Sequence, residues 1–398
     1  MLTDRFRVAG FRAAGVSCGI KQRRLDLALI ASDRPAAAAG VFTRSSVVGA
    51  PVEVSREHLR SPSARVIVAN SGCSNVATGP RGRRDARAMA GAAARATGAA
   101  TREVLVASTG VIGVPLPIAK VRRGIRGAAQ ALAPGGFARA ARAIMTTDTV
   151  PKLAAIRLRL GAHEVSLGGI AKGSGMIEPN MATLLAFLAT DAAVAPAYLA
   201  RVLHEAVGES FNRLSIDGEG STSDTVLLLA NGASGAASLT GPRSAGAARF
   251  EQAVGDLCVA LTRALARDGE GATKLVEIEV RNAASPAEAE RAVRRIGNSA
   301  LVKTALFGGD PNWGRILQTL GAGRVKLDLA RTEVRLGGVV VFRRGGPAGP
   351  VATRRAAVRM RSPEIGISVD LAAGRASARL FTCDFSYDYV RINAEYTT

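Results

Sequence analysis

The chain has 398 residues, of which 47 % are hydrophobic and 21 % are charged, and its formal net charge is +21. This composition excludes a disordered chain, and the length is sufficient for two or three compact units. Every apolar run is shorter than the ~18 residues that a membrane span needs, and the N-terminal segment lacks the apolar core of a secretory signal. We therefore expect a cytoplasmic protein without a membrane partner.

The positive charge makes nucleic-acid binding the first functional alternative. The basic residues are mostly Arg and are dispersed along Ala-rich segments, and aromatic residues make up only 4 % of the chain, too few for base stacking. The four cysteines form no CxxC pair, and the three histidines form no HExxH motif. These patterns predict free thiols, no nucleic-acid partner and no metal site.

The first half of the chain alternates expected strands and helices. Apolar runs rich in branched residues predict strands at 25–32, 64–72 and 102–110. Helical spacing of apolar residues predicts helices at 83–98, 117–132 and 137–145. The segment 156–173 is typical of a hairpin that leads into a glycine-rich loop. The almost wholly apolar run 181–190 predicts a buried helix.

The second half continues this alternation. We expect helices at 197–214 and 250–269 and strands at 224–232 and 273–281. Ser285, followed by Pro286 and Glu288, predicts a helix start with a capping box. Later strands are expected at 325–330, 332–342, 366–372 and 376–386. The pattern predicts a boundary near residue 282, with a smaller C-terminal α/β unit at 283–398.

Four glycine-punctuated segments stand out, at 107–113, 171–187, 268–274 and 308–316. None has the G-x4-G-K-[ST] phosphate loop, the G-x-G-x-x-G dinucleotide fingerprint or the G-x-S-x-G nucleophile elbow. Standard nucleotide-binding folds and α/β-hydrolases therefore lose support.

Thr183 lies in the unusual segment 171–187, AKGSGMIEPNMATLLAF. One interpretation is a helix N-cap whose hydroxyl satisfies a backbone N–H. The other is an N-terminal nucleophile, because cleavage of the Ala182–Thr183 bond would give Thr183 a free amino group with a pKa of about 7.7–8.0. Such an amine can take the hydroxyl proton without a histidine, which suits a chain with few of them.

Acyl transfer also needs donors for the developing oxyanion. Thr109 and Gly110 follow an expected strand, so a hydroxyl and a backbone N–H could point outward at its end. The alternative is an ordinary turn at the end of a strand.

The segment 171–187 resembles the self-cleavage motif of the ornithine acetyltransferase family, also called glutamate N-acetyltransferase. The resemblance extends over nearly the whole chain. It includes GFRAAGVSCGIK, DLALIASDRPAAAAGVFT, NSGCSN, ASTGVIG, IMTTDT, GDPNWGRI and DYVRINAEY, in the order that the family has them. The family implies an α/β fold in which sheets are layered between helices (αββα-like), and an α2β2 heterotetramer.

The resemblance implies self-cleavage into an α chain (1–182) and a β chain (183–398), with Thr183 as the nucleophile and Thr109 and Gly110 as the oxyanion hole. The substrate-binding residues implied are Thr146, Lys172, Thr183, Glu270, Asn393 and Thr398. Thr147 is the alternative to its neighbour Thr146. Lys172 suits an α-carboxylate and Glu270 an ammonium group, although either could be an ordinary solvated side chain.

The implied reaction is a ping-pong transfer of the acetyl group from N2-acetylornithine to glutamate through acetyl-Thr183. It needs no bound cofactor. Some members of the family also accept acetyl-CoA, which is then a co-substrate. The main alternative is a self-processing amidase or aminopeptidase of related fold, in which water replaces glutamate.

The sequence departs from the family pattern at four positions. Cys73 stands where Asn is expected in NSGCSN, and Glu219, Gly220 and Ser223 are unusual in DGEGSTSD. These departures leave the expected nucleophile and oxyanion hole in place and bear on substrate preference and rate.

Overall fold

A computed structural model describes residues 6–178 and 184–395 of the chain. These residues form two compact units. The first contains residues 6–212 and 219–265, and the second contains residues 213–218 and 266–395. The C-terminal unit expected at 283–398 therefore omits the strand before residue 283 and the segment 213–218, which belong to the second unit.

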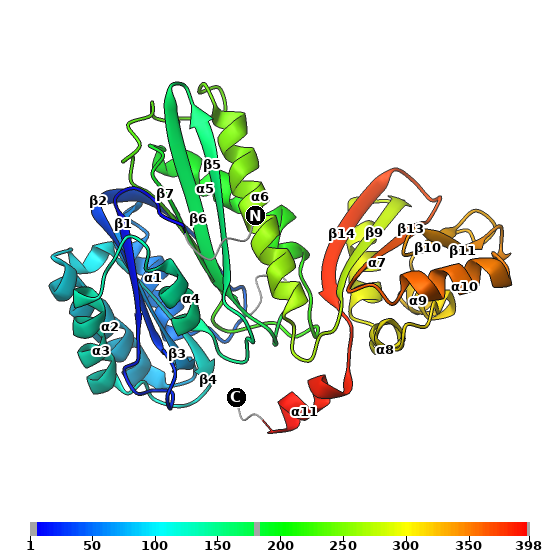
Figure 1. Cartoon of the computed structure of the whole chain (residues 1–398), viewed down its shortest axis with the longest axis horizontal. Helices are drawn as coiled ribbons and strands as arrows, with labels where there is room; N and C mark the ends of the chain where they lie inside the picture. Colours follow the sequence, from blue (N-terminus) through cyan, green and yellow to red (C-terminus); the bar gives the residue numbers. More distant parts are fainter. Residues whose placement is uncertain (1–5, 179–183, 396–398) are drawn as a thin grey trace. The chain divides into compact units, whose positions relative to one another are not determined.

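The first unit is built on an eight-stranded sheet with the order β4-β3-β2-β8-β7-β6-β5, and β1 pairs with β2 (Figure 1). Its strands are β1 (Phe11–Val16), β2 (Leu27–Phe42), β3 (Ser63–Cys73), β4 (Val104–Val111), β5 (Lys152–Leu160), β6 (His163–Lys172), β7 (Leu185–Thr190) and β8 (Thr225–Ala230). The β3–β4 and β7–β8 pairs are parallel and the other pairs are antiparallel.

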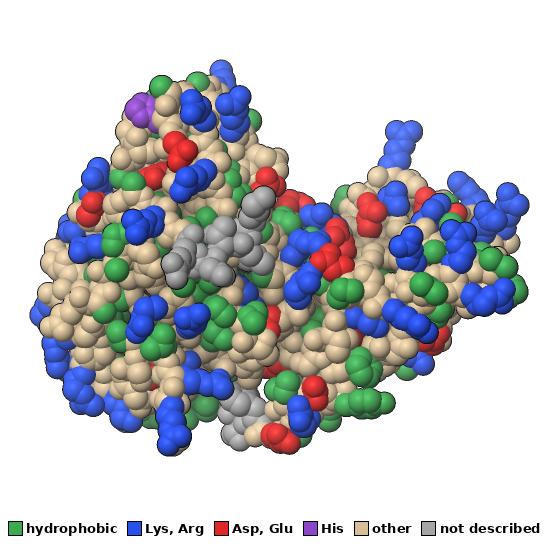
Figure 2. Space-filling model, in the orientation of Figure 1, with side chains coloured by type: hydrophobic (Ala, Val, Ile, Leu, Met, Phe, Trp, Pro, Cys, Tyr) green, Lys and Arg blue, Asp and Glu red, His purple; other side chains and the backbone are tan. Residues whose placement is uncertain are grey.

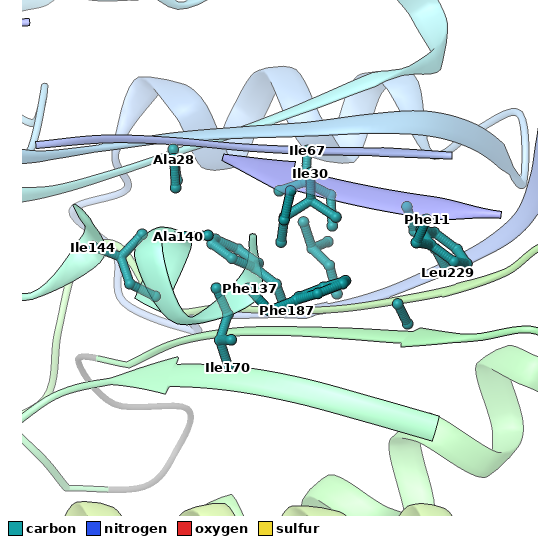
Figure 3. Packing of buried hydrophobic residues seen from close by; sticks show 14 of the residues in the cluster. Phe11, Ala28, Ile30, Ile67, Phe137, Ala140, Ile144, Ile170, Phe187 and Leu229 are labelled. Atoms are coloured by element: carbon teal, nitrogen blue, oxygen red, sulfur yellow. The ribbon is translucent and has the colours of Figure 1, made fainter. Parts of the chain in front are cut away.

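The long strand β2 joins two halves of this sheet. Its first part pairs with β1 and β3, and after an irregularity between Ala31 and Ala36 its last part pairs with β8. The two halves face each other across a core that also holds α4 (Phe137–Ile144), as Figure 3 shows. Ile30 and Ile67 contribute to this core from one half, and Ile170 and Phe187 from the other.

Helices cover the outer faces of both halves. A second apolar cluster joins the outer face of β1–β4 to α1 (Ala50–His58), α2 (Gly79–Thr97) and α3 (Ile118–Gln130). On the other half, α5 (Pro196–Glu209) contacts β2 and β8. Leu261 of α6 (Ala247–Arg267) lies against Gly169 of β6. The expected α/β fold with sheets layered between helices is confirmed.

The second unit has a six-stranded sheet with the order β12-β11-β10-β13-β9-β14. Its strands are β9 (Leu275–Ala283), β10 (Glu333–Leu336), β11 (Val339–Arg343), β12 (Gly346–Pro347), β13 (Glu364–Asp370) and β14 (Ala376–Cys383). The helices α7 (Pro286–Gly297), α8 (Ala300–Gly308), α9 (Trp313–Ala322) and α10 (Pro350–Arg359) share one apolar core with these strands. A last helix, α11 (Tyr387–Glu395), follows β14.

Three expected elements are wrong. The expected strand 332–342 is a hairpin, because Gly337 and Gly338 turn the chain between β10 and β11. The run 181–190 is not a helix, because its described part forms β7, which lies between β6 and β8 with both faces buried. A strand buried on both faces is apolar at every position and gives no period-2 signal. Residues 325–330 form no strand, because Val325 is buried in the core of the second unit while the residues after it lead into a turn.

The expected helix start at Ser285 is confirmed, since its side chain accepts a hydrogen bond from the backbone N–H of Glu288. Within the described residues, the Glu288 side chain does not return a bond to the Ser285 backbone N–H, so only half of the capping box forms. The Glu288 carboxylate instead accepts bonds from the backbone N–H of Lys326 at 2.6 Å and from Arg291 at 3.2 Å. It therefore ties the start of α7 to the segment after α9.

The surface carries its positive charge in a dispersed form. Figure 2 shows Lys and Arg side chains spread over the visible face among apolar and acidic ones. Many arginines are paired with carboxylates, for example Arg83 and Arg87 with Glu57. All four cysteines are free thiols. None of the described helices is long and apolar enough to cross a membrane.

Candidate active site

Lys172, the last residue of β6, is the centre of a buried polar cluster in the first unit. Its Nζ donates hydrogen bonds to Thr146 Oγ1 at 2.8 Å and to Thr109 Oγ1 at 3.3 Å. Lys172 is only 2 % exposed and Thr109 only 3 %. A buried ammonium group needs such partners. The fold thus brings together three of the residues expected from separate segments of the sequence.

Thr109 and Gly110 lie near the end of β4, which runs parallel to β3. Gly110 has a φ of 126°, which side chains rarely adopt. A Cβ atom at Gly110 would lie 2.4 Å from the carbonyl carbon of Gly72 and 2.6 Å from the nitrogen of Cys73. Glycine is therefore required here, and it lets the two backbones approach closely at the proposed oxyanion hole.

The two neighbouring threonines after α4 have different partners. Thr146 Oγ1 accepts the bond from Lys172, whereas Thr147 Oγ1 lies 2.6 Å from Ser174 Oγ. Thr146 is the one that belongs to the Lys172 cluster.

A buried ion pair between Asp148 and Lys152 supports this cluster. Asp148 Oδ1 lies 2.5 Å from Lys152 Nζ and accepts the Gly173 N–H at 2.7 Å, while Oδ2 accepts the Thr146 N–H at 2.9 Å. Burial acts to raise the pKa of the Asp148 carboxyl, but Lys152, Lys172 and these hydrogen bonds outweigh it, and the pKa lies well below its usual range. Asp148 thereby fixes the backbone on both sides of the Lys172–Thr146 bond.

Ala182 and Thr183 lie outside the described residues, but the residue after them is well placed. The Leu184 N–H donates to Asp224 Oδ1 at 2.9 Å, and its carbonyl accepts the Thr225 N–H at 3.1 Å. Leu185 is the register partner of Lys172 in the β6–β7 pair. The chain after Thr183 therefore enters the sheet as a strand beside Lys172, and the helix N-cap interpretation of Thr183 is wrong.

Asp224 is fully buried just before β8. Burial raises the pKa of its carboxyl well above the usual value, although the Leu184 N–H and Lys172 oppose this shift. Its Oδ2 atom is buried without a hydrogen-bond partner among the residues that the structure describes. Buried polar atoms of this kind are uncommon and cluster at functional sites.

Glu270 and Asn393 lie in the second unit and contact each other. Asn393 Nδ2 donates to Glu270 Oε2 at 2.8 Å. Glu270 is 8 % exposed, so it is not a solvated loop carboxylate. Gly271, with a φ of 67°, lets this loop approach the backbone of Tyr389 closely. Thr398 lies outside the described residues.

Sequence reasoning missed Asp148, Lys152 and Asp224. Asp148 and Asp224 stand inside the segments IMTTDT and DGEGSTSD, which had already been singled out, but an aspartate in a loop predicts no burial by itself. Lys152 precedes an expected hairpin and carried no signal. Their roles follow only from the burial of one charge beside another.

The positions that depart from the family pattern differ in their surroundings. Cys73 is 2 % exposed and its thiol donates to the Val114 carbonyl at 3.2 Å, and burial raises its pKa. Glu219 and Gly220 are exposed, whereas Ser223 is buried. Cys73 therefore packs beside Gly110 as a neutral thiol.

Comparison with known proteins adds independent information. The model of the ArgJ family matches residues 12–398 of this chain. A protein of Symbiobacterium thermophilum named arginine biosynthesis bifunctional protein ArgJ is 48 % identical over 393 residues, which cover 98 % of this chain and 97 % of that protein. A Geobacter sulfurreducens protein of the same name is 46 % identical over 392 residues, which cover 98 % of this chain and all of that protein.

Among solved structures, a crystal structure of arginine biosynthesis bifunctional protein ArgJ from Bacillus halodurans is similar, with a TM-score of 0.50 and 38 % identity. The match covers 53 % of this chain and 98 % of that chain. The two sequence relatives thus match nearly the whole chain, whereas this solved structure matches about half of it.

Proposed function

The chain belongs to the ArgJ family, and on this premise we propose that it transfers the acetyl group of N2-acetylornithine to glutamate after cleaving itself between Ala182 and Thr183. The family expected from the sequence is confirmed, as is its class, an acyltransferase of arginine biosynthesis. The cleavage, the nucleophile and the order of the two transfers are the parts that we propose.

One observation supports the proposal above all others. The Lys172 ammonium joins Thr109 and Thr146 in the first unit, and Lys172 is the sheet partner of Leu185, two residues after Thr183. The first strand of the proposed β chain thus pairs with the residue at the centre of the polar cluster, which supports the proposal. The cluster contains an ammonium group and hydroxyl groups, which suit an acyl substrate that carries a carboxylate.

Self-cleavage creates the catalytic base. Addition of water across the Ala182–Thr183 bond leaves a carboxylate on the α chain (1–182) and an amino group on the first residue of the β chain (183–398). An α-amino group has a pKa of about 7.7–8.0, so a large fraction is neutral near physiological pH. This amine takes the proton of the Thr183 hydroxyl as the oxygen attacks.

The first transfer forms an ester. The Thr183 oxygen bonds to the acetyl carbon of N2-acetylornithine, the carbon–nitrogen bond breaks, and the α-nitrogen of ornithine leaves with the proton that the amine carried. Thr109 accepts a hydrogen bond from Lys172, so its own hydroxyl hydrogen can point toward the oxyanion together with the Gly110 N–H.

The second transfer reverses these steps with a new amine. The neutral α-amino group of glutamate attacks the acetyl ester, and Thr183 regains its proton as N-acetylglutamate leaves. Thr146 and Lys172 are the proposed contacts for the substrate backbone, and Glu270, Asn393 and Thr398 for the rest of the substrate. No bound cofactor takes part, and acetyl-CoA is an alternative acetyl donor. The α2β2 assembly and the cytoplasmic location stay predictions.

Release of ornithine from N2-acetylornithine, measured with and without glutamate, tests this function against hydrolysis. A transferase predicts that ornithine release depends strongly on glutamate and equals the amount of N-acetylglutamate formed. Equal release without glutamate, together with free acetate, would instead identify a hydrolase of related fold.

A further inference from the structure

Lys21 lies in the loop between β1 and β2, which a buried carboxylate holds in shape. Asp26 is fully buried and accepts the backbone N–H groups of residues 18–21, at distances from 2.6 to 3.1 Å. With four backbone donors on one carboxylate, the position of the Lys21 backbone is well defined. Its side chain therefore starts from a fixed point.

The Lys21 side chain reaches toward the Lys172 cluster. Its stem lies against Gly72, where a Cβ atom would be 2.9 Å from Lys21 Cγ. Gly72 is the register partner of Gly110 of the proposed oxyanion hole. Its Nζ donates to the Met145 carbonyl at 2.7 Å, and Met145 directly precedes Thr146. Lys21 is thus placed between two parts of the candidate active site.

The Lys21 ammonium group has donors to spare. Among the described residues, the Met145 carbonyl is its only hydrogen-bond acceptor, and it forms no ion pair. An ammonium group has three N–H donors. Lys21 and Thr146 are both half-buried, whereas Lys172 is fully buried and already bonded to two hydroxyl groups. Lys21 therefore has N–H donors that a ligand from solution can reach.

The local charge balance favours an anion at this position. Asp148 pairs with Lys152 at 2.5 Å, and the Asp26 carboxylate is enclosed by backbone N–H groups. Burial lowers the pKa of the Lys21 ammonium to about 8; Asp26 and Asp148 oppose this shift, while Arg24 and Lys172 add to it. A carboxylate beside Lys21 would remove this penalty.

We propose that Lys21 binds the α-carboxylate that N2-acetylornithine and glutamate share, and that this ion pair orients both substrates toward the proposed oxyanion hole. The inference rests on the proposed function. It adds Lys21 to Thr146 and Lys172, the contacts already proposed for the substrate backbone, and gives the α-carboxylate a second cationic partner. One anion subsite used by both substrates fits a ping-pong reaction, in which they occupy the same pocket in turn.

The test compares Lys21→Met with a matched control, Lys120→Met. Methionine keeps the stem that packs on Gly72 and removes the charge. Lys120 also donates to a carbonyl of the same loop, that of Gly19 at 2.9 Å, but it is exposed on α3. The readout is the ratio of kcat/KM for N2-acetylornithine to kcat/KM for its α-carboxamide, measured within each variant. A general loss of folding or activity cancels in this ratio.

We expect Lys21→Met to lower the carboxylate preference about 10- to 100-fold, the usual effect of a lost charge-assisted hydrogen bond. The KM values for N2-acetylornithine and for glutamate should rise together, with a smaller change in kcat. Lys120→Met should retain the wild-type ratio. If Lys21→Met is too slow to assay, calorimetric binding of ornithine should be weakened by the same factor.

The inference would be overturned if Lys21→Met left the ratio unchanged, because equal losses with the carboxylate and the carboxamide indicate a structural role. Unchanged ornithine binding in Lys21→Met would overturn it as well. Failure of the proposed function looks different, because the wild-type protein would then transfer no acetyl group to glutamate.

Discussion

The ammonium nitrogen of Lys172 lies 2.8 Å from the hydroxyl oxygen of Thr146, 26 residues earlier in the chain. Thr146 makes this hydrogen bond, whereas the hydroxyl of Thr147 lies beside Ser174 instead. A difference of one residue in sequence thus becomes a difference of partner, and it assigns each threonine a distinct expected role.

Thr146→Val removes the acceptor of the Lys172 bond and keeps the shape of the side chain. We expect kcat/KM for N2-acetylornithine to fall about 10- to 100-fold, because a hydrogen bond to a charged group is lost where substrate binds. Thr147→Val is the matched control and should lower kcat/KM less than threefold. Steady-state kinetics of both variants test this expectation. A larger loss of kcat/KM in Thr147→Val than in Thr146→Val would show that Thr147, and not Thr146, serves the substrate.

Gly110→Ala should damage the proposed oxyanion hole through the backbone. The new Cβ would lie 2.4 Å from the Gly72 carbonyl carbon at a φ of 126°, so β3 and β4 must move apart. We expect a loss of at least about 2 kcal/mol in the free energy of unfolding and a 100-fold or larger loss of kcat. Gly113→Ala is the control, with a φ of 81° but open space around it. Denaturant titration and kinetics should show milder effects for that variant.

Lys152→Met should destabilise the protein, because it leaves the Asp148 carboxylate buried without its ion-pair partner. Removing one member of such a pair costs about 3–5 kcal/mol. Adding Asp148→Asn to the same variant should recover part of that loss, since the uncompensated charge is then gone. Urea unfolding of the single and double variants measures the loss and the recovery in the free energy of unfolding. A single variant as stable as the wild type would contradict a structural role for the pair.

The same pair predicts how stability depends on pH. The pKa of Asp148 is lower in the folded protein than in the unfolded chain. Its contribution is therefore present above about pH 4 and is lost as the pH falls through the folded-state pKa. Lys152→Met should show a weaker loss of stability on acidification than the wild type.

Asp224→Asn tests the unusual ionisation of the buried carboxyl beside Leu184. In the unfolded chain this carboxyl ionises near pH 3.9, whereas in the folded protein it keeps its proton to higher pH. The contribution of the Asp224 carboxyl to the free energy of unfolding of the wild type therefore falls as the pH rises above about 4, by up to about 1.4 kcal/mol per pH unit. Asparagine can still accept the Leu184 N–H and cannot ionise. The variant should gain stability relative to the wild type between pH 4 and pH 7; a constant difference would show that Asp224 is ionised.

The fold was largely predictable because most of its elements carry a clear period. The hairpin of β5 and β6 and the amphipathic helices α2, α3 and α5 lie where the sequence places them. The sequence predicts a helix where β7 lies, because every residue of Leu185–Thr190 is buried and the apolar run shows neither the helical nor the strand period. The error concerned the element that follows the proposed nucleophile.

The candidate active site was predictable only in part. Thr109, Thr146 and Lys172 were found through a resemblance, and their contacts depend on three segments that meet through the sheet. Lys21 and Asp224 were missed because nothing local distinguishes them. Burial and the direction of a side chain are properties of the folded chain, and a single sequence does not encode them as a short motif.

Intact-mass analysis of purified wild-type protein and of Thr183→Ala, before and after incubation with N2-acetylornithine, examines the nucleophile itself. The wild type should give two chains, 1–182 and 183–398, and the second should gain the mass of one acetyl group on incubation. Thr183→Ala should stay a single 41.0 kDa chain and gain nothing. A Thr183→Ala protein that is cleaved, or that transfers acetyl groups at the wild-type rate, would contradict the proposed mechanism.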